Sequence, residues 1–221
     1  MTRSYGYNSK PYHTTFYGKH KQEDFTESAF TYHADFISKN KAQDLYNISS
    51  MNETIIKGRG LFTTSKDYRD SDIFFIKDIN SNPLYKQIVD KFMSLNDEIY
   101  QADITEIQQL QYTYYYPKQH FNWHPDGPFA ITKNNKDIPW PDDLLYRKLT
   151  LALCLSKHDE YEGGEFMILD PFTTPDRAVA SFKMDAGEAI IFPAFLFHKV
   201  APVISGVRKS IITWGCGPRW K

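Results

Sequence analysis

The chain has 221 residues, a formal net charge of −1 and 41% hydrophobic residues, which fits one globular domain with or without an elaborated terminus. A net charge so close to zero argues against a general polyanion-binding protein. No apolar run approaches the ~20 residues needed to cross a bilayer, and residues 1–5 lack the apolar stretch of a secretory signal. Cys154 and Cys216 lie in apolar, strand-like runs, which favours two buried free thiols over a disulfide. We therefore expect a cytoplasmic protein without membrane contacts.

Residues 1–30 form a polar and aromatic arm in which tyrosines and phenylalanines alternate with lysines and Arg3, and acidic residues begin only at Glu23. Basic and aromatic side chains in alternation can stack on and neutralise nucleic acid. The same pattern also fits an arm whose aromatic side chains pack on the domain or on a neighbouring subunit. The sequence leaves both interpretations open.

Two stretches of the first half have helical periodicity. Apolar positions recur at helical spacing over residues 34–51, where Ser38 could instead cap a helix that begins there, and again over residues 84–96. Residues 72–76 read as a short buried strand between them. The helices most simply cover one face of a sheet.

From residue 104 onward the pattern is that of short strands at roughly ten-residue spacing, with turn signals between them. The expected strands are 108–116, 149–155, 166–169, 180–184, 190–197 and 207–214. This spacing predicts a mainly β fold with flanking helices, either a sandwich or a jelly roll. We expect an arm at 1–30 and one domain at 31–221, with helical support at 34–100 and the β core at about 104–217.

One short stretch, residues 121–128, carries a histidine and an aspartate two positions apart, His124 and Asp126. In an extended segment these two side chains point to the same side. An imidazole nitrogen and a carboxylate oxygen then provide two ligands of a metal site, and a second histidine would complete the set that binds non-haem Fe(II) with open positions. Taken alone, this spacing is a weak signal.

A second group of polar residues follows the strand expected at 190–197. His198 ends that strand, Arg208 comes ten residues later, and Ser210 lies two residues beyond Arg208 on the same strand face. An arginine can bind a carboxylate through two hydrogen bonds, and a serine hydroxyl can donate one more. Each of these residues alone also fits an ordinary surface position, so the argument depends on their combination.

Taken together, these motifs resemble the Fe(II)- and 2-oxoglutarate-dependent dioxygenases, and most closely the prolyl-4-hydroxylase-like group in its bacterial and viral branch. The similar segments are 110–115, 124–126, 147–168 with its Gly163-Gly164 turn, and 187–214. Residues 1–100 resemble the group only loosely. The resemblance implies a double-stranded β-helix, a distorted jelly roll, as the core.

The resemblance implies that His124, Asp126 and His198 are the iron ligands and that Arg208, helped by Ser210, holds the distal carboxylate of 2-oxoglutarate. Tyr115 stands where the group often has a tyrosine that hydrogen-bonds the cosubstrate. Tyr114 and Tyr116 are alternatives for this role, because a shift of one residue in strand register moves every side chain to the opposite face of the sheet. Trp214 would face the same cavity. In the strand 149–155 only Thr150 offers a hydroxyl, and its role stays open.

The implied reaction is hydroxylation, in which 2-oxoglutarate and O₂ give succinate and CO₂, with Fe(II) as cofactor and ascorbate as a stimulant. Related halogenases replace the acidic ligand with a small residue, whereas this chain has Asp126. The resemblance favours a prolyl residue of a peptide or protein as the substrate, with a small molecule as a further option. Residues 129–147 would border the substrate entrance and form a lid with the arm.

Two other functions compete with this interpretation. An alkylated-nucleic-acid demethylase of the same superfamily would use the basic and aromatic arm, but the strand after Arg208 lacks the second arginine that such enzymes usually have there. A non-catalytic binding module on the same fold is the other, and the intact set of metal-ligand candidates argues against it. The sequence gives no indication of oligomeric state.

Overall fold

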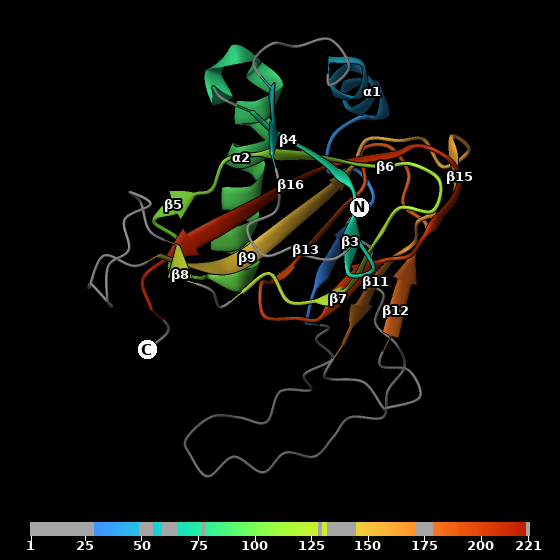
Figure 1. Ribbon diagram of the computed structural model, residues 1–221. Helices are drawn as coiled ribbons and strands as arrows, with labels where there is room; N and C mark the ends of the chain where they lie inside the picture. Colours follow the sequence, from blue (N-terminus) through green and yellow to red (C-terminus); the bar gives the residue numbers. More distant parts are fainter. Residues whose placement is uncertain are drawn as a thin grey trace.

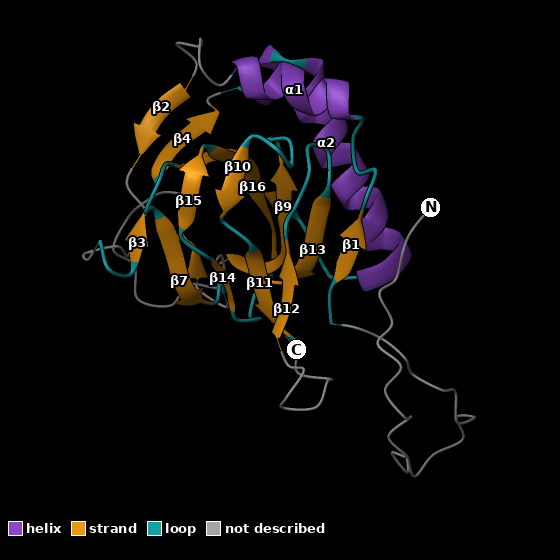
Figure 2. Ribbon diagram, turned by 90° about the vertical axis from the view of Figure 1, so that its right-hand side faces the viewer, coloured by secondary structure: helices purple, strands orange, loops and turns teal. Residues whose placement is uncertain are grey.

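Two β-sheets face each other and two helices lie on the outer face of the larger sheet (Figures 1 and 2). The structure is a computed structural model that describes residues 29–48, 55–58, 66–76, 78–127, 130–131, 145–170 and 179–219, with the backbone alone at 55–58 and 130–131. Residues 1–28 of the expected arm and most of the expected entrance loop at 129–147 lie outside the described residues.

The larger sheet is antiparallel throughout, in the order β1-β13-β9-β16-β6-β4-β2, with β5 paired to β16 and β8 to β9. Its long central strands, β9 and β16, pair along most of their length, with Ser210 opposite Cys154 and Trp214 opposite Thr150. Its strands are β1 (Thr31–His33), β2 (Ile55–Gly58), β4 (Asp72–Ile76), β5 (Glu106–Ile107), β6 (Gln111–Tyr115), β8 (Ala130–Ile131), β9 (Leu145–Cys154), β13 (Ala189–Pro193) and β16 (Arg208–Gly217).

The smaller sheet has the order β12-β11-β14-β7-β3 and is also antiparallel. Its strands are β3 (Arg69–Asp70), β7 (His120–His124), β11 (Phe166–Leu169), β12 (Val179–Phe182) and β14 (His198–Val200). A separate pair, β10 (Tyr161–Gly163) with β15 (Val203–Gly206), extends the molecule beyond the two sheets. The two facing antiparallel sheets confirm the expected mainly β fold with a jelly-roll core and flanking helices.

The helices begin where the sequence supplies a capping side chain. α1 (Lys39–Ile48) begins directly after Ser38, whose hydroxyl accepts a hydrogen bond from the Lys41 amide at 3.4 Å. The Asn82 side chain caps α2 (Pro83–Leu95) by accepting from the Leu84 amide at 2.9 Å, and Pro83 occupies the first turn, where its missing N–H costs nothing. A 3-10 turn, η1 (Ile79–Ser81), precedes α2, and a π-helical turn, η2 (Asn96–Tyr100), follows it.

Two hydrophobic clusters divide the core between the layers. One lies between the helices and the larger sheet and contains Leu45, Ile88 and Phe92 together with Leu151 from β9. The other lies between the two sheets and contains Ala152 from β9 with Phe166, Ile168 and other residues of the smaller sheet. Because side chains of a strand alternate between its faces, β9 contributes to both clusters, which explains why it is buried from Lys148 to Cys154.

The predicted position of His198 at the end of a strand 190–197 is wrong. β13 ends at Pro193, a turn closes with the Leu196 amide bonded to the Pro193 carbonyl at 2.9 Å, and His198 begins β14 in the other sheet. The apolar run hides this break because Phe195 and Phe197 are hydrophobic yet exposed to solvent by 50% and 48%. The turn is what carries the chain from the larger sheet into the smaller one.

Cys154 and Cys216 are both free and buried, as expected. None of the helices in the described part of the chain has the length and apolarity that crossing a membrane requires.

Candidate metal and cosubstrate site

Three potential metal ligands come together where β7 and β14 of the smaller sheet pair. β7 ends at His124, Asp126 follows two residues later, and the pairing of β14 with β7 places His198 opposite His124. The Asp126 carboxylate lies 3.8 Å from His124 Nε2 and 3.5 Å from His198 Nε2, and the candidate ligand atoms all lie within 4.8 Å of one another. All three side chains are buried.

The backbone fixes the tautomer of both imidazoles. His124 Nδ1 lies 2.7 Å from the Asn122 carbonyl, and His198 Nδ1 lies 3.0 Å from the Leu196 carbonyl. Since a carbonyl oxygen can only accept, each Nδ1 carries a proton. In the neutral imidazole the lone pair is then on Nε2, the atom that lies toward Asp126. Metal-binding histidines are oriented in this way, so the donor set fits a divalent metal ion.

Asp126 is ionised and held in position by its neighbours. Burial alone would raise the pKa of its carboxyl, but His198, His124, Arg147 and the nearby indole of Trp214 outweigh burial and lower the pKa to about 2. The Thr150 hydroxyl donates a hydrogen bond to Asp126 Oδ2 at 2.9 Å. Thr150, whose role the sequence left open, thus bonds the candidate metal ligand.

His124 is held neutral by its surroundings. Burial, reinforced by the adjacent His198, lowers the pKa of His124 to about 3. The Phe121 ring stacks on the imidazole with centroids 3.3 Å apart, and the ring of Tyr68 meets it edge-on at 6.4 Å. A neutral imidazole is the form that binds a metal.

A buried guanidinium, that of Arg208, lies at the start of β16. Arg208 is 2% exposed, its terminal nitrogen donates to Ser210 Oγ at 3.4 Å, and it lies 5.8 Å from the centroid of the Tyr115 ring. Among the described residues it forms no ion pair with a carboxylate, and its Nε has no hydrogen-bond partner. A buried charge in this state fits an anionic ligand that completes the site.

The three tyrosines that the sequence could not distinguish lie in three different places. Tyr115 is buried between the sheets opposite Arg208, and burial raises the pKa of its phenol despite the charges of Arg69 and Arg208. Tyr114 packs in the helix-side cluster, and Tyr116 is 41% exposed. Only Tyr115 of the three therefore lies between the sheets beside Arg208.

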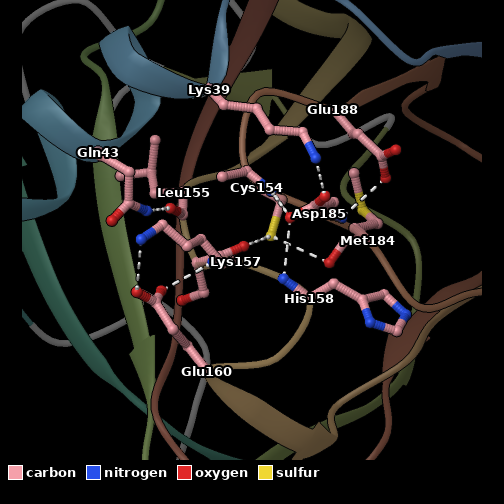
Figure 3. Close-up of polar contacts among 12 residues, drawn as sticks. Lys39, Gln43, Cys154, Leu155, Lys157, His158, Glu160, Met184, Asp185 and Glu188 are labelled. Carbon is pink, nitrogen blue, oxygen red and sulfur yellow. Dashed lines mark hydrogen bonds and ion pairs between the residues drawn. The ribbon is translucent and has the colours of Figure 1, made fainter.

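The wall around Arg208 contains groups that the sequence did not single out. The Tyr161 hydroxyl lies beside Arg208 and donates to the Met184 carbonyl at 2.6 Å. Cys154 Sγ also contacts the Met184 carbonyl, at 3.8 Å, and Figure 3 shows this thiol within a network that ties the turn before β13 to the loop after β9. In that network Asp185 pairs with Lys39 and accepts from the His158 amide. Met184 joins this network to Arg208, because its Sδ lies 3.9 Å from a terminal nitrogen of the guanidinium.

The structure places Trp214 on the same side of β16 as Arg208 but near the metal-ligand candidates. The Arg147 guanidinium stacks on the indole at 3.7 Å, and Trp214 Nε1 is buried with no hydrogen-bond partner among the described residues.

Gly163 and Gly164 have φ of +67° and +64°, and a Cβ at Gly163 would lie 2.4 Å from the Pro202 carbonyl. Their interpretation as a turn requirement fits this geometry.

A jelly roll with two histidines and an aspartate beside a buried arginine defines a class of metal-dependent oxygenases. Residues 110–215 match the family model of the 2OG-Fe(II) oxygenase superfamily. This part of the chain is thus similar to a superfamily whose members use Fe(II), 2-oxoglutarate and O₂.

Similar sequences include hydroxylases named as PKHD-type. One from Janthinobacterium sp. (strain Marseille) is 38% identical over 96 residues, which are 43% of this chain and 38% of that protein. One from Shewanella baltica (strain OS155 / ATCC BAA-1091) is 27% identical over 131 residues, which are 59% of this chain and 53% of that protein. The chain thus matches between about two fifths and one half of the length of these curated relatives.

Similar solved structures extend over most of the chain. A Pseudomonas putida prolyl-4-hydroxylase has a TM-score of 0.65 and 13% identity, with 89% of this chain and 96% of that chain covered. A viral collagen prolyl hydroxylase from Paramecium Bursaria Chlorella virus-1 has a TM-score of 0.61 and 19% identity, with 86% and 96% covered. At these identities the likeness establishes the shared fold.

Proposed function

We propose that this protein is an Fe(II)- and 2-oxoglutarate-dependent dioxygenase that hydroxylates a prolyl residue of a peptide or protein. The observation that carries the proposal is that the His124–Asp126–His198 cluster lies near Tyr115, which pairs with the buried Arg208, a guanidinium with no carboxylate partner among the described residues. The metal ion held by these ligands would bind one end of a short dicarboxylic acid, and the arginine would bind the carboxylate at the other end.

His124, Asp126 and His198 would hold the iron through two imidazole Nε2 atoms and one carboxylate. Thr150 keeps the Asp126 carboxylate oriented, and the carbonyls of Asn122 and Leu196 hold the proton of each neutral imidazole on Nδ1, which leaves Nε2 for the metal. When bound, Fe(II) supplies the activation of O₂ by which 2-oxoglutarate becomes succinate and CO₂ and the substrate gains a hydroxyl. The retained acid at Asp126 favours hydroxylation over halogenation.

Arg208 would bind the distal carboxylate of 2-oxoglutarate, with the Ser210 and Tyr115 hydroxyls as additional donors. The guanidinium and the Ser210 hydroxyl already lie 3.4 Å apart on one face of β16. A bidentate, charge-assisted hydrogen-bonded contact between a guanidinium and a carboxylate is strong where the surrounding protein excludes water. Burial of the cosubstrate between the sheets would also protect the oxidising step from solvent.

The prolyl substrate is supported by the relatives. The similar curated proteins are named as PKHD-type hydroxylases, and two of the similar solved structures are described as prolyl hydroxylases. A further structural neighbour, from Streptomyces hygroscopicus, has hygromycin B bound, so the fold itself also accommodates small molecules. We place the protein in the cytoplasm, with ascorbate as a stimulant of turnover.

The test is 2-oxoglutarate turnover by the purified protein with Fe(II), ascorbate and a panel of prolyl peptides, followed as succinate formation. Asp126→Ala and His198→Ala should abolish turnover while circular dichroism and thermal unfolding show a folded protein. Turnover that persists in both variants would rule out the metal assignment. Alkylated oligonucleotides serve as the alternative substrate class, and their demethylation would replace the prolyl proposal.

A further inference from the structure

Two arginines that the cosubstrate assignment does not use lie beside the metal-ligand candidates. Arg69, on β3, places its guanidinium 4.4 Å from the centroid of the Phe121 ring, and Phe121 in turn stacks on His124. Arg69 uses its Nε to donate to Ser71 Oγ at 2.8 Å. Its terminal nitrogens have no acceptor among the described residues. The side chain is thus fixed in orientation and still has hydrogen-bond donors to offer.

Arg147, near the start of β9, approaches from the larger sheet. Its guanidinium stacks on Trp214 at 3.7 Å, its Nε donates to Gln108 Oε1 at 2.8 Å, and one terminal nitrogen donates to the Asp126 backbone carbonyl at 3.2 Å. Burial is the main cause that lowers the pKa of both arginines, and both interact electrostatically with Asp126. Asp126 therefore interacts electrostatically with one guanidinium from each sheet, that of Arg69 from the smaller sheet and that of Arg147 from the larger one.

Neither arginine has an acidic partner of its own. No ion pair among the described residues includes Arg69 or Arg147, and Asp70, next to Arg69 in sequence, instead accepts from Gln119 at 3.2 Å. In the loaded site, the charges of Fe(II) and Arg208 are balanced by Asp126 and the 2-oxoglutarate dianion. The charges of Arg69 and Arg147 then remain uncompensated at a half-buried position, where an unpaired charge is costly.

We infer that Arg69 and Arg147 form an anion subsite that binds a carboxylate of the substrate next to the iron. This inference rests on the proposed function and adds the chemical class of the substrate: a prolyl compound with a carboxylate close to the ring, either a free C-terminal carboxylate or an acidic side chain. A carboxylate fits the planar, forked donors of arginine. The net charge of −1 for the whole chain argues against the extended basic surface that a polyphosphate would need.

Matched probes separate the two sources of the carboxylate. One pair is a prolyl peptide with a free C-terminal carboxylate and the same peptide as its amide, and the other is an amidated peptide with glutamate beside proline and its glutamine counterpart. Binding is measured without turnover, by anaerobic calorimetric titration of the protein loaded with Fe(II) and 2-oxoglutarate. We expect one acidic probe to bind about tenfold or more tightly than its neutral match, the scale of a charge-assisted contact.

The variants Arg69→Gln and Arg147→Gln should each remove most of that preference, and Arg147→Lys should restore part of it. Lys86→Gln, which removes an exposed charge on α2 far from the pocket, is the matched control and should keep the wild-type preference. Thermal unfolding and unchanged 2-oxoglutarate affinity show that the variants are folded.

Equal binding within both pairs, no binding of any probe, or a preference that survives both glutamine variants would overturn the anion subsite. Tighter arginine-dependent binding of a phosphate-bearing oligonucleotide would overturn the carboxylate class. Failure of the proposed function looks different, because 2-oxoglutarate would then not bind or turn over in the wild-type protein even without a substrate. The acidic preference would still be measured on the metal-loaded protein in that case.

Discussion

At the scale of single residues, the candidate metal site depends on how firmly each ligand is oriented before a metal arrives. The imidazoles of His124 and His198 are fixed through their Nδ1 atoms by backbone carbonyls, whereas the Asp126 carboxylate accepts a hydrogen bond from the Thr150 side chain. Partners that orient a metal ligand matter nearly as much as the ligand itself, because a freely rotating carboxylate loses entropy on binding. Thr150 is therefore the residue through which ligand positioning can be tested separately from ligand identity.

Thr150→Val keeps the side-chain shape but removes the hydroxyl that bonds Asp126 Oδ2. We expect the Fe(II) affinity to fall about tenfold, the lower end of the effect of losing such a partner. Anaerobic metal titration measures it, and Thr150→Ser, which keeps the hydroxyl, should bind Fe(II) nearly as wild type does. Wild-type affinity in Thr150→Val would show that Thr150 does not position the carboxylate.

Arg208→Ala should chiefly weaken binding of 2-oxoglutarate and leave the Fe(II) affinity nearly unchanged. A lost charge-assisted contact is worth ~1.5–3 kcal/mol, which is roughly a tenfold to hundredfold change in dissociation constant. The dissociation constant of 2-oxoglutarate is measured by anaerobic titration, with thermal unfolding as the check on folding. Wild-type affinity for 2-oxoglutarate in this variant would remove Arg208 from the cosubstrate site.

At the scale of elements, the site depends on strand pairing more than on proximity in sequence. His198 is 74 positions after His124 and yet lies directly opposite it, because β14 pairs with β7 in the smaller sheet. Arg208 lies opposite Tyr115 because β16 pairs with β6 in the larger sheet. Each sheet thus contributes one half of the pocket, and the turn between β13 and β14 connects the halves.

The sequence predicted several elements closely where a local signal exists. The strand 72–76 and the strand 166–169 have their expected bounds, since each is a short apolar run with polar or glycine flanks. The helix expected at 84–96 is found as α2, one residue earlier at each end. The break at Pro193–His198 was missed because exposed phenylalanines continue the apolar pattern through a turn. Exposure of that kind depends on tertiary structure, so periodicity cannot reveal it.

Asn82→Ala should lower the free energy of unfolding by about 1 kcal/mol, because it removes the side-chain cap that accepts from the Leu84 amide. α2 lies on the outer face of the larger sheet, away from the smaller-sheet strands β7 and β14 that carry His124 and His198 (Figure 2), so the 2-oxoglutarate affinity should not change. Urea unfolding measures the stability, and Asn82→Ser, which keeps a capping oxygen, is the control. Equal stability of the alanine and serine variants would contradict the capping role.

At the scale of the whole molecule, buried neutral histidines link folding to pH. Burial, with a smaller contribution from Lys91, lowers the pKa of His33 to about 4, and the His33 ring bonds the Thr31 hydroxyl at 2.9 Å. Between about 4 and the ordinary value of 6.5 the unfolded chain binds more protons than the folded chain, so stability falls as the pH falls through this window.

His33→Gln should reduce this loss of stability between pH 7 and pH 5, because glutamine does not titrate. Urea unfolding at the two pH values measures it as the difference in the free energy of unfolding. His124 contributes a loss of the same sign through its lowered pKa, so a smaller dependence on pH should remain. An unchanged dependence in the variant would show that His33 is not the linked group.

The sequence named His124, Asp126, His198, Arg208, Ser210 and Tyr115. The structure brings the first three within 4.8 Å of one another and places Arg208 beside Ser210 and Tyr115, and the Tyr115 phenol interacts electrostatically with both Arg208 and Asp126. The contributions of Thr150, Tyr161, Arg69 and Arg147 could not be predicted from spacing, since each reaches the pocket from a strand whose register only the folded sheets define. Motif spacing thus identified the groups closest to the chemistry, and the groups that orient them required the structure.

The most direct test of the metal and cosubstrate assignment is an anaerobic titration of the metal-free protein with Fe(II) and then 2-oxoglutarate. It follows the weak visible charge-transfer band of the iron chelate. We expect the band in the wild-type protein, its loss in Asp126→Ala, and a requirement for more 2-oxoglutarate in Arg208→Ala. Iron binding without any band would contradict the role of Arg208 and favour a non-catalytic binding module. If no iron binds, the protein shares only its fold with the 2-oxoglutarate oxygenases.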